Sequence, residues 1–339
     1  MENLHLLKNL LDSPKKVVIV THFKPDADAL GSSLGLAGFL RGKGHHVDVI
    51  SPSDFPDFLV WMDGAESVIA LSKKTDLPTK TAERTIQNAD LIFCLDFSSL
   101  GRINELGEMV KRSSAKKILI DHHLEPENFA EFILWDVSSA STAQLIFRLI
   151  DLLGEKNKIN SKIADCLYAG LMTDTGGFRH NNTTQKEFQV AEELVGLGAN
   201  PSEVARMIYD TSSLGRLRLM GYVLSKKLTV LEEYNTAYMT LSENDLKQFD
   251  TQTGDTEGLV NFGLSIKGVK LSVFMYDRKE EIKISFRSLG DFSVNDLARK
   301  HFEGGGHKNA AGGSSKLTLE ETLNRFLSIL PEYKKALAH

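Results

Sequence analysis

Residues of the kinds that bind metal ions follow several apolar segments of this chain. The apolar segments Val17–Val20, Leu91–Leu95 and Ile118–Ile120 are followed by Thr21-His22-Phe23-Lys24-Pro25-Asp26-Ala27-Asp28, by Asp96 and by Asp121-His122-His123, respectively. A fourth group, Thr173-Asp174-Thr175-Gly176-Gly177, follows a segment with a helical pattern. Carboxylates and imidazoles are common ligands of divalent cations, so these groups are the candidate metal ligands of the chain.

The first half of the chain alternates short apolar runs with helical patterns. A further strand is expected at Val47–Ile50, and helices are expected at Ala29–Arg41, Ala140–Leu153 and Ile163–Leu171. This alternation predicts an α/β fold with a mostly parallel sheet that helices cover on both faces. Ligands of such sheets bind where the carboxyl ends of the strands meet. The candidate metal ligands are therefore expected to converge at that edge.

Several carboxylates gathered in one place need counter-charge, since unpaired buried carboxylates are costly or take up protons. Two divalent cations about 3.5–4 Å apart would supply it, and such a pair can activate water and stabilise the attacking and leaving oxygens at phosphorus. A mixed imidazole and carboxylate shell suits Mn²⁺ better than Mg²⁺. Mg²⁺ or Co²⁺ would be the substitutes, and Zn²⁺ or Co²⁺ could bind without being the working metal. Taken singly, Asp28 and Asp96 also fit helix caps and Asp174 fits a turn. Their joint positions favour a metal centre.

The pattern changes in the second half of the chain. Residues 185–226 have a helical pattern, in which Pro201 is expected to open a helix. Beyond it we expect strands at Ala237–Leu241, Lys270–Tyr276 and Glu281–Arg287, helices at Val294–Lys300 and Leu319–Leu330, and a Gly-rich loop at Gly304–His307. These elements predict a catalytic domain at 1–190, a helical connector at 191–226 and a smaller α/β substrate-binding domain at 227–339, with a cleft between the two domains.

Groups suited to binding phosphate occur in the predicted second domain. A Gly-rich loop can bring backbone N–H groups close to a phosphate, and an arginine can hold one through two hydrogen bonds. The candidate substrate-binding residues are Arg287, Ser288, Gly305, Gly306, His307, Lys308 and Asn309. Arg179 and His180, soon after Asp174, fit either substrate contact or a cap of the preceding helix.

Composition excludes several classes of protein. The net charge of −5 argues against a protein that coats long duplex nucleic acid through a broad basic surface. The charge is uneven, because residues 216–339 hold 18 Lys and Arg against 16 Asp and Glu, a net of +2 that leaves −7 for the rest. No apolar run reaches the ~18–20 residues of a membrane span, and no secretory signal is visible, so a cytoplasmic location is expected. Cys94 and Cys166 are expected to be reduced core residues.

The candidate ligands, taken together, resemble the signature motifs of the DHH phosphoesterase superfamily. The matching segments are His22-x-x-x-Asp26-x-Asp28, Asp96 after its apolar strand, Asp121-His122-His123 and Thr173-Asp174-Thr175-Gly176, in the family's order. The later segment from Gly304 to Gly313 resembles the signature of the DHH-associated substrate domain. The resemblance spans residues 15–335, and Ala27 replaces a glycine that often separates the two aspartates. Length and second domain are most similar to the bacterial nano-RNase A type.

This resemblance implies a role for each residue of the site. His22, Asp26 and Asp96 would hold one metal ion, Asp28, Asp96, His122 and Asp174 the other, and Asp96 would bridge the two. His123 would face the scissile phosphate as a catalytic residue beside Asp96. The implied enzyme degrades short oligoribonucleotides and linear dinucleotides from one end and dephosphorylates adenosine 3′,5′-bisphosphate to AMP.

Two other functions fit the same motifs. A pyrophosphatase or exopolyphosphatase would use the same metal centre, although pyrophosphate calls for a denser cluster of Lys and Arg than the Gly-rich segment supplies. A catalytically silent nucleotide-binding protein would be expected to lack a metal ligand, and the motifs here are complete. The expected partners are short single-stranded RNA and small nucleotide phosphates rather than long duplexes or membranes. An oligomeric state does not follow from the sequence.

Overall fold

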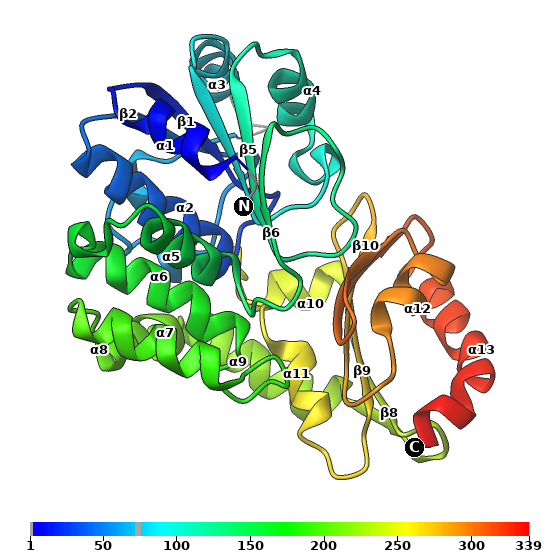
Figure 1. Ribbon diagram of the computed structural model, residues 1–339. Coiled ribbons are helices and arrows are strands. Elements are labelled where there is room, and N and C mark those ends of the chain that lie inside the picture. Colours follow the sequence, from blue (N-terminus) through cyan, green and yellow to red (C-terminus); the bar gives the residue numbers. More distant parts are fainter. Residues whose placement is uncertain (1–2, 72–75, 339) are drawn as a thin grey trace. The chain divides into compact units, whose positions relative to one another are not determined.

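The chain folds into two compact units, each built on its own six-stranded sheet. A computed structural model describes residues 3–71 and 76–338, and the units are Met1–Thr211 and Ser212–His339 (Figure 1). Among the described helices, none has both the length and the apolar character needed to cross a bilayer.

The sheet of the first unit is parallel throughout. Its strands are β1 (Lys16–Val20), β2 (His46–Ser51), β3 (Ile69–Ala70), β4 (Leu91–Leu95), β5 (Lys116–Asp121) and β6 (Phe132–Trp135). They are ordered β3-β2-β1-β4-β5-β6, so the direction of chain progression reverses between β1 and β4. The carboxyl ends of strands at such a reversal form the ligand-binding crevice of open α/β sheets.

Helices cover both faces of this sheet, as the alternation of apolar runs and helical patterns predicts. Val17 and Ile19 of β1 face one core cluster, and Val18 and Val20 face the other. The first cluster includes α1 (Leu4–Leu11), α2 (Ala27–Gly42), α5 (Thr142–Leu152), α6 (Ser161–Asp174), α7 (Gln185–Gly196) and α8 (Pro201–Tyr209). The second includes α3 (Leu77–Gln87) and α4 (Glu105–Arg112). The strands are therefore buried on both sides.

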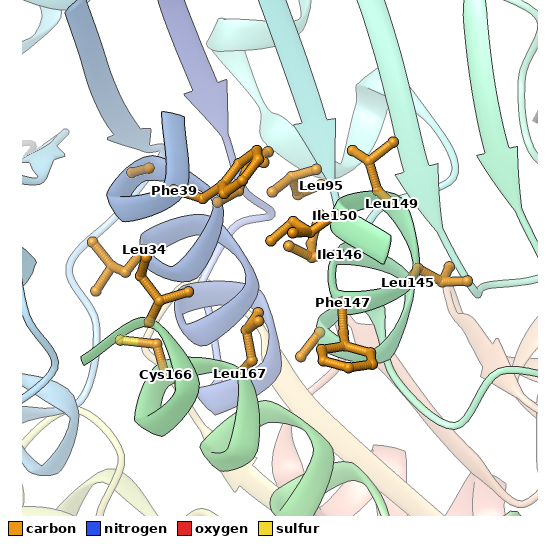
Figure 2. Packing of buried hydrophobic residues seen from close by; sticks show 14 of the residues in the cluster. Leu34, Phe39, Leu95, Leu145, Ile146, Phe147, Leu149, Ile150, Cys166 and Leu167 are labelled. Carbon is orange, nitrogen blue, oxygen red and sulfur yellow. The ribbon is translucent and has the colours of Figure 1, made fainter. Parts of the chain in front are cut away.

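The helices α2, α5 and α6 pack closely on one another. Figure 2 shows Leu34 and Phe39 of α2, Ile146 of α5, Leu167 of α6 and Leu95 of β4, which all belong to one buried cluster. Burying each such side chain contributes roughly 1.5–3 kcal/mol relative to leaving it in water. Glycines bring α2 against α6, since a Cβ on Gly31 would lie 2.4 Å from the backbone oxygen of Cys166.

The second unit has a mixed sheet ordered β11-β12-β10-β9-β8-β7, in which only the β8–β9 pair is parallel among the described pairings. Its strands are β7 (Thr229–Leu231), β8 (Thr236–Leu241), β9 (Leu271–Asp277), β10 (Ile282–Ser288), β11 (Gly305–His307) and β12 (Ala310–Ser315). One face packs on α12 (Val294–His301) and α13 (Leu319–Ala338). The other packs on α9 (Leu214–Tyr222), α10 (Glu243–Gln248) and α11 (Leu259–Leu264).

Short helical turns complete the elements. They are η1 (Asp57–Leu59), η2 (Ala65–Ser67), η3 (Leu100–Ile103), η4 (Lys156–Lys158), the π-helical η5 (Val223–Lys227) and η6 (Glu232–Tyr234). The predicted segment 191–226 is helical, with Pro201 at the start of α8, and the two units divide inside it, after Thr211.

One predicted element is wrong. The Gly-rich segment Gly304–His307 is not a loop, because its residues 305–307 form β11 and pair antiparallel with β12. Glycine is rare in strands, so composition pointed to a loop. Here the absence of a side chain lets the chain run close to β12, since a Cβ on Gly304 would lie 2.2 Å from the backbone oxygen of Gly312.

Candidate metal centre

The candidate ligands of the first unit come from the ends of neighbouring elements. His22 follows β1, Asp96 follows β4, and His122 follows β5. Because β4 lies between β1 and β5 in the parallel sheet, the residues that follow these strands emerge at the same edge. The remaining candidates are Asp26 and Asp28 at the start of α2 and Asp174 at the end of α6.

Asp96 lies between two groups of ligands. Its Oδ2 lies 3.4 Å from Nε2 of His22, and its Oδ1 lies 3.5 Å from Nε2 of His122. Nε2 of His22 also lies 4.0 Å from Oδ1 of Asp26. Nε2 of His122 lies 3.8 Å from Oδ2 of Asp28 and 3.4 Å from Oδ2 of Asp174. The structure thus brings together all the residues proposed as ligands, with a different oxygen of Asp96 facing each histidine.

Backbone carbonyls set the orientation of both histidines. Nδ1 of His22 lies 3.0 Å from the carbonyl oxygen of Phe23, and Nδ1 of His122 lies 3.1 Å from that of Ser139. A carbonyl can only accept, so each Nδ1 carries a proton and donates it. The Nε2 atoms are then left as the nitrogens that face the carboxylates. A donated Nδ1 proton is the usual means by which proteins fix the tautomer of a metal-binding histidine.

Asp28 is buried and held by another helix. Its carboxylate accepts the backbone N–H groups of Thr142, at 2.7 Å, and Ala143, at 2.8 Å, which begin α5. Asp26, rather than Asp28, caps α2, and it accepts the N–H groups of Asp28 and Ala29. The cap and ligand interpretations of Asp26 therefore do not exclude each other, because one carboxylate has several lone pairs.

Asp96 adopts a backbone conformation that few non-glycine residues take. Its φ is 64°, in the left-handed region, where backbone strain is commonly stored at functional sites. Its own N–H continues the sheet ladder by donating to the oxygen of Ile120, at 3.1 Å. The hydroxyl of Thr142 donates to Oδ1 of Asp96 at 2.8 Å. These contacts hold the carboxylate at the strand end despite the strain.

The carboxylates of this cluster perturb one another. Burial and the charge of Asp96 raise the pKa of Asp28 well above its ordinary value, and burial and the charge of Asp28 do the same for the pKa of Asp174. Burial alone would lower the pKa of His122, but Asp96 and Asp174 raise it to about 10. The protein alone therefore retains protons here. Divalent cations fit this donor set, since they supply the counter-charge that the protons otherwise provide.

Asp96 differs from the other carboxylates of the centre. Burial alone would raise its pKa, but hydrogen bonds with His122 and His22 hold that pKa well below the ordinary value. Asp96 is therefore ionised across the neutral pH range, the state in which a carboxylate can bind a cation.

His123 is positioned by the residue two places before it. Its Nδ1 lies 2.8 Å from Oδ1 of the fully buried Asp121 and 3.6 Å from Oδ1 of Asp96. Its backbone oxygen accepts the indole N–H of Trp135 at 2.7 Å. Asp121 was predicted only as part of its motif, with no role of its own, and Thr142 was not predicted to belong to the site. Asp121 adjoins His122, and Thr142 follows Ser141, the N-cap of α5, but spacing alone does not distinguish ligands from the residues that support them.

The turn after Asp174 is built from left-handed residues. Gly176, Gly177 and Phe178 have φ values of 60°, 69° and 63°. The ring of His180 lies over Gly176, where a Cβ would come within 2.3 Å of Nε2. Nε of Arg179 donates to the oxygen of Gly176 at 2.7 Å. These contacts show that Arg179 and His180 shape the helix end, and contact of Arg179 with substrate remains a prediction.

The candidate residues of the second unit gather around β10, β11 and β12. Ser288 is buried, donates its hydroxyl to the oxygen of Phe292 at 2.6 Å and accepts the side-chain amide of Asn309 at 2.9 Å. The N–H of Gly306 donates to Asn295 at 2.9 Å. Ser288, Asn309 and the Gly306 N–H therefore shape this region, and a role in substrate binding remains a prediction for them.

The charged candidates of the second unit lie on the same strands. Arg287 lies opposite Ala310 in the β10–β12 ladder, and its Nη1 donates to the oxygen of Phe286 at 3.0 Å. Lys308, between β11 and β12, forms an ion pair with Asp291 at 2.8 Å. His307 ends β11. Their contact with substrate, and that of Gly305, also remains a prediction.

Two family models match the chain. The model of the DHH family N-terminal domain matches residues 16–171, which include every candidate ligand except Asp174. The model of the DHHA1 domain matches residues 233–336, within the second unit.

Similar proteins cover nearly the whole chain. A protein of Thermus thermophilus named bifunctional oligoribonuclease and PAP phosphatase NrnA is 33% identical over 98% of this chain and 94% of its own length. Its namesake in Bacillus subtilis is 30% identical over 88% of each chain. The crystal structure of an exopolyphosphatase-related protein from Bacteroides fragilis has a TM-score of 0.92 and 42% identity, over 99% of this chain and 97% of that one.

Proposed function

Because this chain belongs to the DHH family of phosphoesterases, hydrolases of phosphoester bonds, we propose that it degrades very short RNA from one end. We propose that it also removes the 3′-phosphate of adenosine 3′,5′-bisphosphate. The observation that carries the proposal is the convergence of His22, His122 and the three aspartates Asp26, Asp28 and Asp174 around Asp96. The names of the two NrnA relatives, each at least 30% identical over most of the chain, favour these substrates.

Two Mn²⁺ ions are the cofactors that this donor set suits best, with Mg²⁺ or Co²⁺ as substitutes. His22, Asp26 and Asp96 would hold one ion. The other would be held by Asp28, Asp96, His122 and Asp174. When bound, such a pair lowers the pKa of water and stabilises the oxygens that attack and leave phosphorus.

The chain's own residues position the reacting phosphate. His123 is oriented by Asp121, so that its Nδ1 proton is donated to the carboxylate and its Nε2 is directed elsewhere. In its imidazolium form the ring carries a proton on Nε2 as well. We assign this Nε2–H to a non-bridging oxygen of the scissile phosphate, where a donor stabilises charge that develops in the transition state. Thr142 holds Asp96, and the start of α5 holds Asp28, so the ligands are arranged before substrate binds.

The second unit is assigned to the terminal nucleotide. Arg287, His307 and Lys308 are cationic or hydrogen-bonding groups suited to phosphate but not to the activation of water. Binding of one terminal nucleotide by these residues would explain a preference for short chains and for cleavage from one end. Linear dinucleotides and adenosine 3′,5′-bisphosphate are the smallest substrates that such binding would retain.

A second function has support from one comparison. The structure from Bacteroides fragilis, 42% identical over nearly the whole chain, is described as exopolyphosphatase-related. Hydrolysis of polyphosphate or pyrophosphate would use the same centre and differ only in the groups that hold the rest of the substrate. A catalytically silent protein is disfavoured, because no candidate ligand is missing.

One experiment separates these functions. Purified protein with Mn²⁺ is incubated with a labelled RNA dinucleotide, a labelled RNA 24-mer, adenosine 3′,5′-bisphosphate, pyrophosphate and polyphosphate, and products are separated. We expect rapid conversion of the dinucleotide to mononucleotides and of the bisphosphate to AMP and phosphate, and much slower attack on the 24-mer. Faster release of phosphate from polyphosphate or pyrophosphate would replace the proposed function by the second one.

A further inference from the structure

We propose that Gln144 and Glu187 form a buried hydrogen-bond relay that positions His122 and sets the affinity of the metal position to which His122 belongs. Both are positioning residues, because the hydrogen bonds of their side chains in the described part of the chain go to one another and to residues 139, 140 and 184. The inference rests on the proposed metal-dependent function and names side chains that control the same centre from a distance.

The relay begins at the ring of His122. Nδ1 of His122 donates to the backbone oxygen of Ser139 at 3.1 Å. The hydroxyl of Ser139 donates to Oε1 of Gln144 at 2.7 Å, and the N–H of Ala140 donates to the same oxygen at 2.8 Å. Gln144 lies in the first turn of α5 and is buried, with 8% of its surface exposed. One amide oxygen thus fixes the backbone segment that accepts the histidine proton.

Glu187 fixes the orientation of that amide. Nε2 of Gln144 donates to Oε1 of Glu187 at 2.8 Å, while Oε2 of Glu187 accepts both the N–H and the hydroxyl of Thr184 at 2.6 Å. Glu187 is 1% exposed. Burial alone would raise its pKa, but the hydrogen bonds from Thr184 and Gln144 lower it, so the carboxylate is charged and can only accept.

The direction of every hydrogen bond in the relay follows from this one charge. An ionised Glu187 requires the NH₂ group of Gln144, which leaves the amide oxygen for Ser139 and Ala140. The carbonyl of Ser139 then stays in place for the Nδ1 proton of His122. The Glu187 carboxylate thus acts on His122 through Gln144 and Ser139. It supports the tautomer in which Nε2 of His122 faces the carboxylates of Asp28, Asp96 and Asp174.

The same backbone segment is linked to Asp174. The side-chain amide of Asn182 donates to the oxygen of Asp174 at 3.2 Å and to the oxygen of Ala140 at 3.4 Å. A shift of residues 139–140 would therefore disturb both His122 and Asp174, and both belong to the same metal position. His22 is instead oriented by the carbonyl of Phe23, so the relay acts on one position only.

Glu187 also closes the capping box of α7 with Thr184, which by itself explains a contribution to stability but not an effect on metal. The chain offers a matched control in the second unit. Ser242 and Asp245 form the same kind of capping box at the start of α10, and Asp245 is also buried and bonded to further side chains, Tyr222 and Lys227. These partners of Asp245 include none of the candidate ligands.

The test measures Mn²⁺ binding by calorimetry on metal-free protein, with thermal melting in parallel. The single variant Glu187→Gln places two amide groups opposite one another, and Gln144→Glu places two carboxylates opposite one another. The exchange variant Q144E/E187Q restores a donor opposite every acceptor, since a glutamate at 144 accepts from Ser139 and Ala140 and the new amide at 187 donates to it. Asp245→Asn is the control.

We expect each single variant to weaken one of the two Mn²⁺ positions by about 10–100-fold, and the exchange variant to recover most of that loss. Asp245→Asn should lower the melting temperature without changing Mn²⁺ affinity. If the single variants only lower the melting temperature, or if the exchange variant stays as impaired as they are, the relay is refuted. If the unmodified protein binds no Mn²⁺ at all, the proposed function itself fails, which is a distinguishable result.

Discussion

Gly170 of α6 lies directly against the carboxylate of Asp28, so closely that a Cβ on Gly170 would stand 2.6 Å from Oδ1 of Asp28. The same Cβ would lie 2.7 Å from Cβ of Ala143 in α5. Because Gly170 has no side chain, α6 leaves room for Asp28 of α2. The Asp28 carboxylate can then reach the backbone N–H groups at the start of α5 that hold it.

Gly170→Ala should impair both stability and metal binding. The added methyl group has to displace Asp28 or Ala143, and overpacking of this kind costs about 1–3 kcal/mol. Denaturant unfolding gives the loss of stability, and Mn²⁺ titration gives the loss of affinity. Gly42→Ala, near the end of α2 with nothing within 4 Å of its Cβ position, is the matched control and should leave both unchanged or slightly improved. Normal Mn²⁺ binding together with normal stability of Gly170→Ala would contradict the tight packing of Gly170 on Asp28 and Ala143.

Asp96→Asn should remove the charge that both metal positions share and abolish turnover. Its carboxylate is the group that faces both His22 and His122, so both positions should lose affinity together. The metal content after gel filtration in Mn²⁺ and the rate of dinucleotide hydrolysis are the measurements. Asp90→Asn, at the opposite end of β4 and exposed, is the control and should behave as the unmodified protein. Retention of one full equivalent of Mn²⁺ by Asp96→Asn would contradict the shared role.

The residues proposed as metal ligands could be predicted from the sequence, whereas the residues proposed to position them could not. His22, Asp96 and His122 could be placed because apolar strands precede them and parallel strands end at one edge. Gln144 and Glu187 could not, because each looks like an ordinary residue of a helix start, and only the packing of α5 against α7 brings them together. The strand β11 was not predicted for a related reason. Its glycines have a low strand propensity, and their fit against β12 becomes visible only in the folded structure.

Mn²⁺ affinity should rise as the pH rises through the neutral range. Without metal, Asp96 and Asp174 raise the pKa of His122 to about 10, so that its Nε2 is protonated at neutral pH. Bound metal needs that nitrogen without its proton, and the proton competes at every pH below this value. Each proton released strengthens binding by up to about tenfold per pH unit. Calorimetry in two buffers of different ionisation enthalpy counts the protons, and the absence of any release at pH 7 would rule out His122 as a ligand.

His123→Ala should separate catalysis from metal binding. His123 is held by Asp121 and is not among the proposed ligands, so both Mn²⁺ ions should remain. Loss of one donor to the transition state should lower kcat by about 10²–10³-fold. Asp121→Asn keeps an acceptor for Nδ1 and should cause a smaller loss. A fall in bound Mn²⁺ by half in His123→Ala would make His123 a ligand instead.

Arg287→Ala and His307→Ala should impair the grip on nucleotides and leave the metal chemistry unaffected. Loss of a charged hydrogen bond to a phosphate costs about 1.5–3 kcal/mol, so kcat/KM on a dinucleotide should fall by roughly 10–150-fold. Bis(p-nitrophenyl) phosphate has no terminal nucleotide for these residues to bind, so the rate of its hydrolysis should change little. Arg278→Ala is the control, because this arginine lies beyond the other end of β10 and is bonded to Tyr276.

Whether kcat or KM changes in these variants shows how Arg287 and His307 contribute to the reaction. A change in KM alone means that Arg287 and His307 bind substrate and transition state equally, whereas a change in kcat means that they help to place the reacting phosphate. Equal losses on the dinucleotide and on the small ester, with unchanged thermal melting, would put both residues in the catalytic centre. That result would refute the assignment of metal chemistry to the first unit and nucleotide binding to the second.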